Sequence, residues 1–182
     1  SVWHKDVRLF NVKQDGKIIS RFYLDLYPRA NKYSHAACFP MIGGKSTEQG
    51  YQMPVATLVC NFPEPTDEMP SLLTHGEVET FFHEFGHVLH NVLTKTQLSS
   101  HSGTSVSRDF VELPSQIMEN WAGHPDVIKS YAKHYITDEP IPDELLEKIE
   151  KTSHFNQGFV TVEYLAASFL DMDWHTLAEP VE

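Results

Sequence analysis

The stretch that decides this fold is residues 74–93, which read THGEVETFFHEFGHVLHNVL. Its apolar side chains recur every three or four positions, as on the buried face of an α-helix. They are Val78, Phe81, Phe82, Phe85, Val88, Leu89 and Val92. Thr74 and Glu77 have the spacing of a capping box, in which each side chain bonds the main-chain amide of the other residue. The stretch therefore predicts an amphipathic helix of about five turns that ends near Leu93.

Within this helix, His83-Glu84-Phe85-Gly86-His87 forms an HExxH motif. Residues four apart share one helical face, with Cβ atoms about 6 Å apart, so the two histidines can bind one zinc ion. Glu84 lies beside the pair, where it can take a proton from a zinc-bound water that attacks a peptide carbonyl. The alternative is a pair of hydrogen-bonded core histidines with a solvated glutamate. The capping box and the apolar stripe favour one zinc ion per chain.

The third zinc ligand is expected to lie outside this helix. A metzincin would have Gly at position 90 and His at position 93, whereas this chain has His90 and Leu93. His90 is expected only to line the site, because about 10.5 Å of helix axis separates it from His83. A glutamate on a following helix is the usual third ligand. Glu112 and Glu119 are both candidates, since they are seven residues apart and could face the same way.

The residues before the motif predict a small β-sheet. Residues 7–12 and 17–27 are rich in Val, Ile, Phe and Tyr, and the Asp-Gly pair between them indicates a hairpin. Residues 55–60 predict a buried third strand. Residues 29–52 mix polar residues with several glycines, which predicts mostly loop.

The residues after the motif predict further helices. A second helix is expected over residues 109–121, where Pro114 disfavours the helical conformation at Leu113. Glu112 is therefore expected at a kink or in a first helical turn. The remaining predicted helices cover residues 125–135, 142–152 and 157–177.

The predicted fold class is α+β. A small N-terminal β-sheet lies in a β-rich part over residues 1–70, and a mainly helical, zincin-like half over residues 71–182 carries the HExxH helix. The length of 182 residues suits one domain, or one domain and a piece of another.

The charge and composition of the chain argue against some classes of binding partner. The formal net charge is −11 and the 14 basic residues are scattered, which argues against nucleic acid or an anionic membrane. No apolar run approaches the roughly 20 residues of a membrane span, and no signal peptide is evident. Cys38 and Cys60 form no metal-binding or redox pattern, so we expect two buried thiols and a cytoplasmic protein. The chain has no initiator Met, which suggests a fragment or a processed form.

The HEFGH motif together with residues 109–116, DFVELPSQ, resembles the thimet oligopeptidase family, which includes oligopeptidase A and peptidyl-dipeptidases. Residues 22–29 (FYLDLYPR) and 32–39 (KYSHAACF) are similar to the same family, and the likeness covers nearly the whole chain. The second half looks closest to the peptidyl-dipeptidase branch and the first half closer to thimet oligopeptidase.

This resemblance implies that Glu112, rather than Glu119, is the third zinc ligand. Glu119 and Asp109 are then candidates for orienting a ligand histidine by hydrogen bonding, against surface or capping roles for each.

The resemblance also suggests that Ser102, Gly103 and Thr104 offer main-chain groups to an extended peptide; the alternative is a plain loop.

The implied activity is that of a zinc metallopeptidase acting on short oligopeptides, either by internal cleavage or by release of C-terminal dipeptides. The resemblance further implies that residues 1–182 are a single catalytic-core fragment of a larger peptidase, whose substrate-contacting loop lies beyond residue 182. Since loss of one oxyanion donor costs about a hundredfold to a thousandfold in turnover, we expect this chain alone to be weakly active or inactive.

Two alternatives belong to other functional classes. A peptide-binding fragment that no longer catalyses would commonly have lost its base, whereas this chain keeps Glu84. A structural zinc site would need four protein ligands, and only three have a rationale. The sequence leaves the oligomeric state open.

Overall fold

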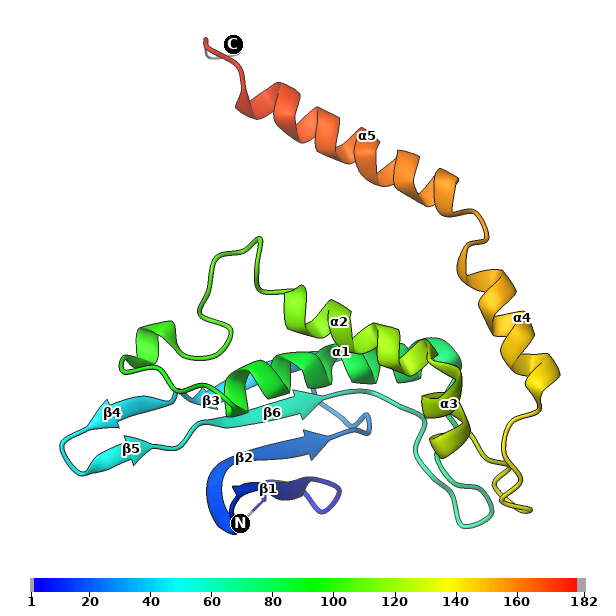
Figure 1. Cartoon of the computed structure of the whole chain (residues 1–182), viewed down its shortest axis with the longest axis horizontal. Helices are drawn as coiled ribbons and strands as arrows, with labels where there is room; N and C mark the ends of the chain where they lie inside the picture. Colours follow the sequence, from blue (N-terminus) through cyan, green and yellow to red (C-terminus); the bar gives the residue numbers. More distant parts are fainter. Residues whose placement is uncertain (1, 180–182) are drawn as a thin grey trace.

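The computed structural model describes residues 2–179, in which a β-rich part precedes the helices (Figure 1). The strands are β1 (Arg8–Gln14), β2 (Lys17–Asp25), β3 (Ala37–Ile42), β4 (Lys45–Thr47), β5 (Gly50–Gln52) and β6 (Val55–Val59). The helices are α1 (His75–Val92), α2 (Leu113–Gly123), α3 (Pro125–Tyr131), α4 (Asp143–Ser153) and α5 (Gln157–His175), with a 3-10 turn at Ser99–His101. The predicted α+β class is confirmed.

The main sheet has four strands in the order β1-β2-β6-β3. Strands β1 and β2 form the predicted antiparallel hairpin, and its turn residues Asp15 and Gly16 both have positive φ, at 50° and 77°. Two left-handed residues give a turn whose twist matches that of the strands, which explains the Asp-Gly pair. Strand β6 runs parallel to β2 and antiparallel to β3, so the sheet is mixed.

The prediction that residues 29–52 are mostly loop missed three strands, because β3, β4 and β5 lie within this segment. Pro40 lies within β3. Because proline lacks a main-chain donor, its presence argues against a strand at this position in the sequence. The strand tolerates Pro40 because it lies at an edge of the sheet, and its register with β6 shifts between Pro40 and Ile42. Strands β4 and β5 form a separate two-stranded hairpin.

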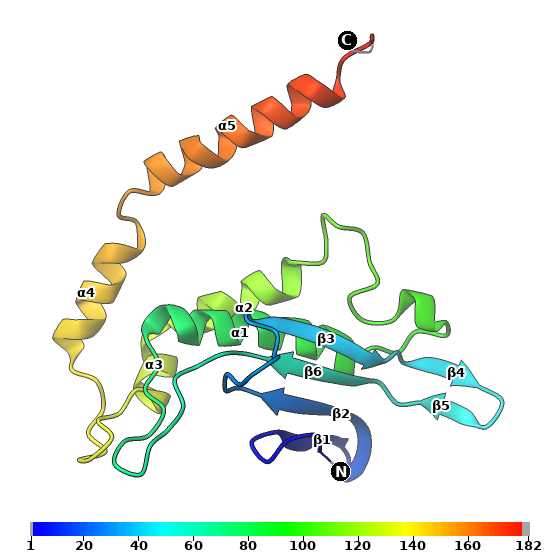
Figure 2. The same cartoon turned by 180° about the vertical axis from the view of Figure 1, so that it is seen from behind.

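Helix α1 packs against the sheet and forms the core with it (Figure 2). The fully buried cluster consists of Ala56, Leu58, Cys60, Phe62, Val88 and Val92. The predicted capping box is present: the Thr74 amide donates to Glu77 Oε2 at 2.7 Å, and the Glu77 amide donates to Thr74 Oγ1 at 3.3 Å. The helix end at Leu93 also agrees with the prediction.

A buried ionic cluster around Asp25 connects the end of β2 to the segments that follow β2 and β6. The Asp25 side chain is 4% exposed and accepts two hydrogen bonds from Arg29, at 2.6 and 2.7 Å. Lys32 contacts the Asp25 carboxylate and also donates to the Cys60 carbonyl just beyond β6. Burial alone would raise the pKa of Asp25, but hydrogen bonds from Arg29, Lys32 and Trp3 outweigh it and lower the pKa to about 2.

Helices α4 and α5 extend away from the sheet and α1 (Figures 1 and 2). Leu146 of α4 is buried, whereas α5 buries none of its residues. All the predicted helices are present, although α3 ends at Tyr131, four residues earlier than expected. No helix within residues 2–179 is long and apolar enough to cross a membrane. Cys38 and Cys60 are both free thiols.

Candidate metal centre

Helix α1 presents two imidazoles side by side. His83 and His87 are four residues apart, and their ring centroids are 5.0 Å apart. The His83 side chain is 26% exposed and that of His87 is 12% exposed. Both rings therefore lie at the boundary between the packed interior and solvent, where a ligand can reach them.

Glu112 approaches these rings from the start of α2. It is the N-cap residue, with φ −87° and ψ −4°, and its side chain makes no capping hydrogen bond. Pro114 lies in the first turn, where its fixed φ suits a helix start. Free of a capping role, the Glu112 carboxylate turns toward α1. Its Oε2 lies 3.2 Å from His83 Nε2 and 3.0 Å from His87 Nε2.

The three side chains have the composition and spacing of a zinc-binding group. One ligand atom from each of His83, His87 and Glu112 lies within 4.8 Å of the others. Four ligands at about 2.0 to 2.2 Å around a tetrahedral zinc are about 3.4 Å apart. The two histidine–carboxylate separations are close to that value, so these residues fit a zinc ion with little rearrangement.

Glu119 contacts the other nitrogen of His83. Its Oε1 lies 2.6 Å from His83 Nδ1, within hydrogen-bond distance. The other ring nitrogen, Nε2, faces Glu112. Carboxylates commonly orient metal-binding histidines in this way.

Ser115 is a site residue that the sequence analysis did not single out. Its hydroxyl lies 2.8 Å from Glu112 Oε2 and 2.9 Å from the Glu112 main-chain oxygen, so it can donate to either. The Ser115 hydrogen bond and the nearby His87 and His83 lower the pKa of Glu112, against the opposing effect of burial. A serine three residues after a glutamate at a helix start is the signal that could have revealed it.

Glu84 follows His83 in α1 but is not part of the three-residue group. Burial first, and then the charge of Glu84, raises the pKa of Cys38 and of Cys60 to about 12. Cys38 lies on β3 and Cys60 follows β6. Both thiols stay protonated at neutral pH.

The segment around Ser102 is anchored one helical turn beyond His87. Ser102 is 6% exposed and its hydroxyl accepts a hydrogen bond from the Gly44 amide at 2.8 Å. Gly103, at φ 57°, lies against Asn91: a Cβ there would be 2.2 Å from Asn91 Oδ1. Asn91 in turn donates to the His87 carbonyl at 2.8 Å. This segment is therefore tied to the helix that carries the histidines.

Two other residues from the sequence analysis lie outside these networks. Asp109 is exposed, and Thr104 is partly exposed. Neither side chain is hydrogen-bonded or ion-paired with another residue in the part of the chain that the structure describes.

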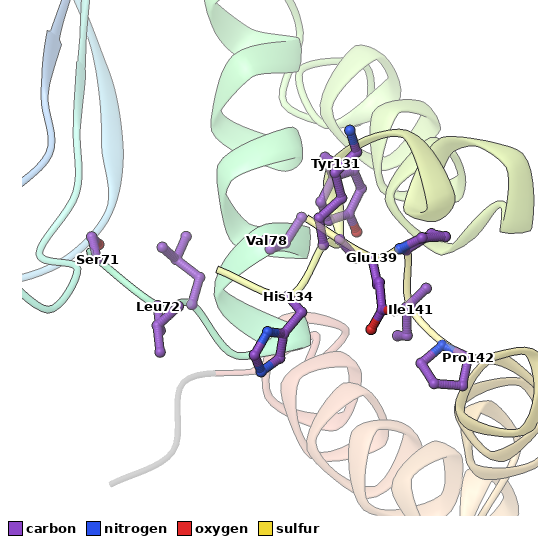
Figure 3. Close-up of a pocket in the computed structure, with 12 residues that line it drawn as sticks. Ser71, Leu72, Val78, Tyr131, His134, Glu139, Ile141 and Pro142 are labelled. Carbon is purple, nitrogen blue, oxygen red and sulfur yellow. The ribbon is translucent and has the colours of Figure 1, made fainter. Parts of the chain in front are cut away.

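A cavity at the start of α1 is separate from the metal-binding group. A cavity of about 660 Å³ lies between the start of α1 and the segment after α3 (Figure 3). Its lining includes Leu72, Val78, Tyr131 and Ile141, and none of the three candidate ligands. A smaller hollow, of about 340 Å³, adjoins the group and is lined by Gly76, Glu79, Thr80, His83 and Glu119.

The chain is similar to known proteins along nearly its whole length. The model of "Peptidase family M3" matches residues 1–182. The chain is 42% identical to a "Thimet-like oligopeptidase" of Dictyostelium discoideum, over 96% of this chain and 27% of the relative. It is 41% identical to a "Dipeptidyl carboxypeptidase" of Salmonella typhimurium, over 99% of this chain and 26% of the relative.

The "Oligopeptidase A" of Escherichia coli is also 41% identical, over 98% of this chain and 27% of the relative. The chain thus spans about a quarter of the length of the curated relatives that it matches. A family model that covers every residue, and relatives at about 40% identity along nearly the whole chain, lead to one conclusion: this chain belongs to peptidase family M3.

Proposed function

We propose that this chain is the metal-binding catalytic core of a zinc metallopeptidase that hydrolyses peptide bonds in short oligopeptides. One observation carries the proposal: Oε2 of Glu112 lies within 3.2 Å of Nε2 of both His83 and His87, so three candidate ligands are grouped together. Membership of a peptidase family supports it, as do relatives whose names are those of peptidases. The proposal takes the two histidines, on a helix packed against a small sheet, as a zincin-like site.

His83, His87 and Glu112 would hold the ion. A bound zinc would make a water molecule more acidic and polarise the peptide carbonyl. The group offers three candidate ligands within residues 2–179, and a tetrahedral zinc held by these three would keep one position open. Three protein ligands are typical of catalytic zinc sites, whereas structural sites are closed by four.

Two glutamates would support the reaction without binding the ion. Glu84 would act as the general base, accepting a proton from the attacking water and passing it to the leaving amine. Glu119 would keep the proton of His83 on Nδ1 and so keep Nε2 available to the ion.

The proposal covers both internal cleavage and release of C-terminal dipeptides. Relatives named oligopeptidase and dipeptidyl carboxypeptidase match this chain at nearly equal identity. We expect low turnover from the chain by itself. The Glu112 side chain is 48% exposed, and electrostatic stabilisation of a transition state is weaker where water has access.

The test combines zinc stoichiometry by elemental analysis with hydrolysis of a fluorogenic peptide. Three proteins are compared: the wild-type chain, Glu112→Ala and Glu84→Gln. We expect one zinc per chain in the wild type and in Glu84→Gln, and loss or strong weakening of zinc binding in Glu112→Ala. Any peptide hydrolysis by the wild type should disappear in Glu84→Gln, since that variant keeps the metal but lacks the base.

Two results would overturn the proposal. Full zinc in Glu112→Ala would show that Glu112 is not a ligand. A wild-type chain that binds no zinc after reconstitution would show that the three-residue group does not hold the metal.

A further inference from the structure

Gly86 allows α2 to approach α1 unusually closely. A Cβ atom at Gly86 would lie 2.5 Å from Ser115 Cα and 2.6 Å from the Pro114 carbonyl oxygen. Both are main-chain atoms, so no side-chain rotation could relieve the overlap. Glycine is unfavourable inside a helix, and this one is buried in the middle of α1. Close contact with the start of α2 explains why a glycine lies there.

The same contact leads directly to Glu112. Ser115 is 0% exposed, and its main chain is the part of α2 that lies against Gly86. Its hydroxyl lies 2.8 Å from Glu112 Oε2, the oxygen that approaches both histidines. Gly86 thus fixes the distance between the two helices, and Ser115 fixes the direction of the Glu112 carboxylate.

We propose that Gly86 and Ser115 are positioning residues that place the Glu112 carboxylate at the metal. The inference rests on the proposed function, because it takes Glu112 as a ligand. Neither residue would touch the ion or the substrate.

The overlap between a Cβ at position 86 and the main chain of α2 indicates how far Glu112 would move. Non-bonded carbon atoms prefer separations of about 3.5 to 4.0 Å, so a methyl group at position 86 would move the start of α2 by about 1 Å. Metal–ligand distances tolerate only about 0.2 Å. An alanine at position 86 would therefore shift Glu112 relative to His83 and His87 and weaken the binding of an ion that all three hold.

The chain offers a matched control for this substitution. Gly76 lies in the same helix, and a Cβ there would meet no atom within 4 Å. Gly86→Ala and Gly76→Ala add the same methyl group to α1, but only the first disturbs α2. Ser115→Ala removes the hydroxyl without adding bulk, so it tests the same proposal even if Gly86→Ala does not fold.

The experiment measures zinc affinity by competition with a chromophoric chelator and records the visible spectrum of the cobalt-substituted proteins. Thermal unfolding of the metal-free proteins reports folding separately. Loss of a group that orients a metal ligand typically weakens affinity about 10-fold to 100-fold. We expect that loss in Gly86→Ala and in Ser115→Ala, with an altered cobalt spectrum, and affinity within about twofold of wild type in Gly76→Ala.

A folded Gly86→Ala or a Ser115→Ala that binds zinc with wild-type affinity and an unchanged cobalt spectrum would overturn the inference. The proposed function would survive that result, provided that the wild type binds zinc and Glu112→Ala does not. Failure of the wild type to bind zinc would overturn both.

Discussion

Helices α1 and α5 are nearly equal in length, at 18 and 19 residues, but their surroundings differ. Helix α1 starts with a capping box and buries one face against the sheet and α2. Helix α5 follows Asn156, which has a left-handed φ of 57° and makes no side-chain capping bond, and none of its residues is buried. The difference shows that an apolar helical sequence alone does not determine how a helix is stabilised.

Five polar residues of α5 lie along one stripe, at helical spacing: Gln157, Thr161, Ser168, Asp171 and His175. The charged Glu163 and Asp173 lie outside this stripe. Most of the remaining surface is apolar and exposed, with Phe159 at 70% and Phe169 at 66%. A helix that is apolar around most of its circumference is typical of a buried helix. Packing within residues 2–179 therefore contributes little to the stability of α5, whereas most helical stability in proteins comes from such packing.

The largest predicted effect comes from deleting equal side-chain volume in the two helices. Val88 of α1 is 0% exposed, whereas Val162 of α5 is 66% exposed. Val88→Ala should lower the free energy of unfolding by about 2 to 3 kcal/mol, through lost burial and a cavity. Val162→Ala should change it by no more than about 0.5 kcal/mol. Urea unfolding monitored by tryptophan fluorescence gives both values, and equal effects would refute the comparison.

Acid should weaken the sheet and leave α5 unaffected. The pKa of Asp25 is lowered from 3.8 to about 2, so its ionised form stabilises the fold. The contribution is present above the unfolded pKa and is lost as the pH falls from about 4 to about 2. Its size is about 2 kcal/mol, because one pKa unit corresponds to about 1.4 kcal/mol.

The measurement is unfolding of wild type and Asp25→Asn at several pH values. The difference between them should shrink as the pH falls through that window. Asp171 of α5 is 70% exposed beside His175, so Asp171→Asn is the matched control and should leave the unfolding free energy unchanged at every pH. A pH-independent difference for Asp25→Asn would contradict the assignment.

The smallest predicted effect concerns the helix starts. Thr74→Ala removes the capping box of α1 and should cost about 1 kcal/mol of unfolding free energy. Asn156→Gly removes a residue that makes no capping bond at the start of α5 and fits the left-handed φ of 57° without strain, so global stability should not change. Thermal unfolding of the two variants beside wild type checks this, and a larger loss from Asn156→Gly would show that α5 contributes to the core.

Local sequence patterns predicted much of the fold, but they could not predict which distant segments pair as strands. Helix α1 and the β1–β2 hairpin depend on capping, periodicity and turn chemistry, all of which operate over a few residues. Strand β3 was missed because it exists through pairing with β6 and contains Pro40. Its identity as a strand depends on a partner about 20 residues away.

In the candidate metal site, too, local spacing was predictable and the packing between helices was not. Helical spacing predicted that His83 and His87 would lie together, and the structure brings them together. Helical spacing could not show whether Glu112 or Glu119 is the third ligand, because both carboxylates approach His83. Glu112 lies at Nε2 and Glu119 at Nδ1. The roles that we infer for Gly86 and Ser115 depend on how α1 and α2 pack, which no spacing within either helix encodes.

The projecting helices also affect how unfolding would respond to denaturant and temperature. The accessible surface is 13364 Å², whereas a compact protein of 20.8 kDa exposes about 9000 Å². Unfolding therefore exposes about a fifth less new surface than this chain length suggests. The urea m-value and the heat-capacity change of unfolding should be smaller in the same proportion. A stability calculated from the urea midpoint with an m-value typical of this size would thus be too high.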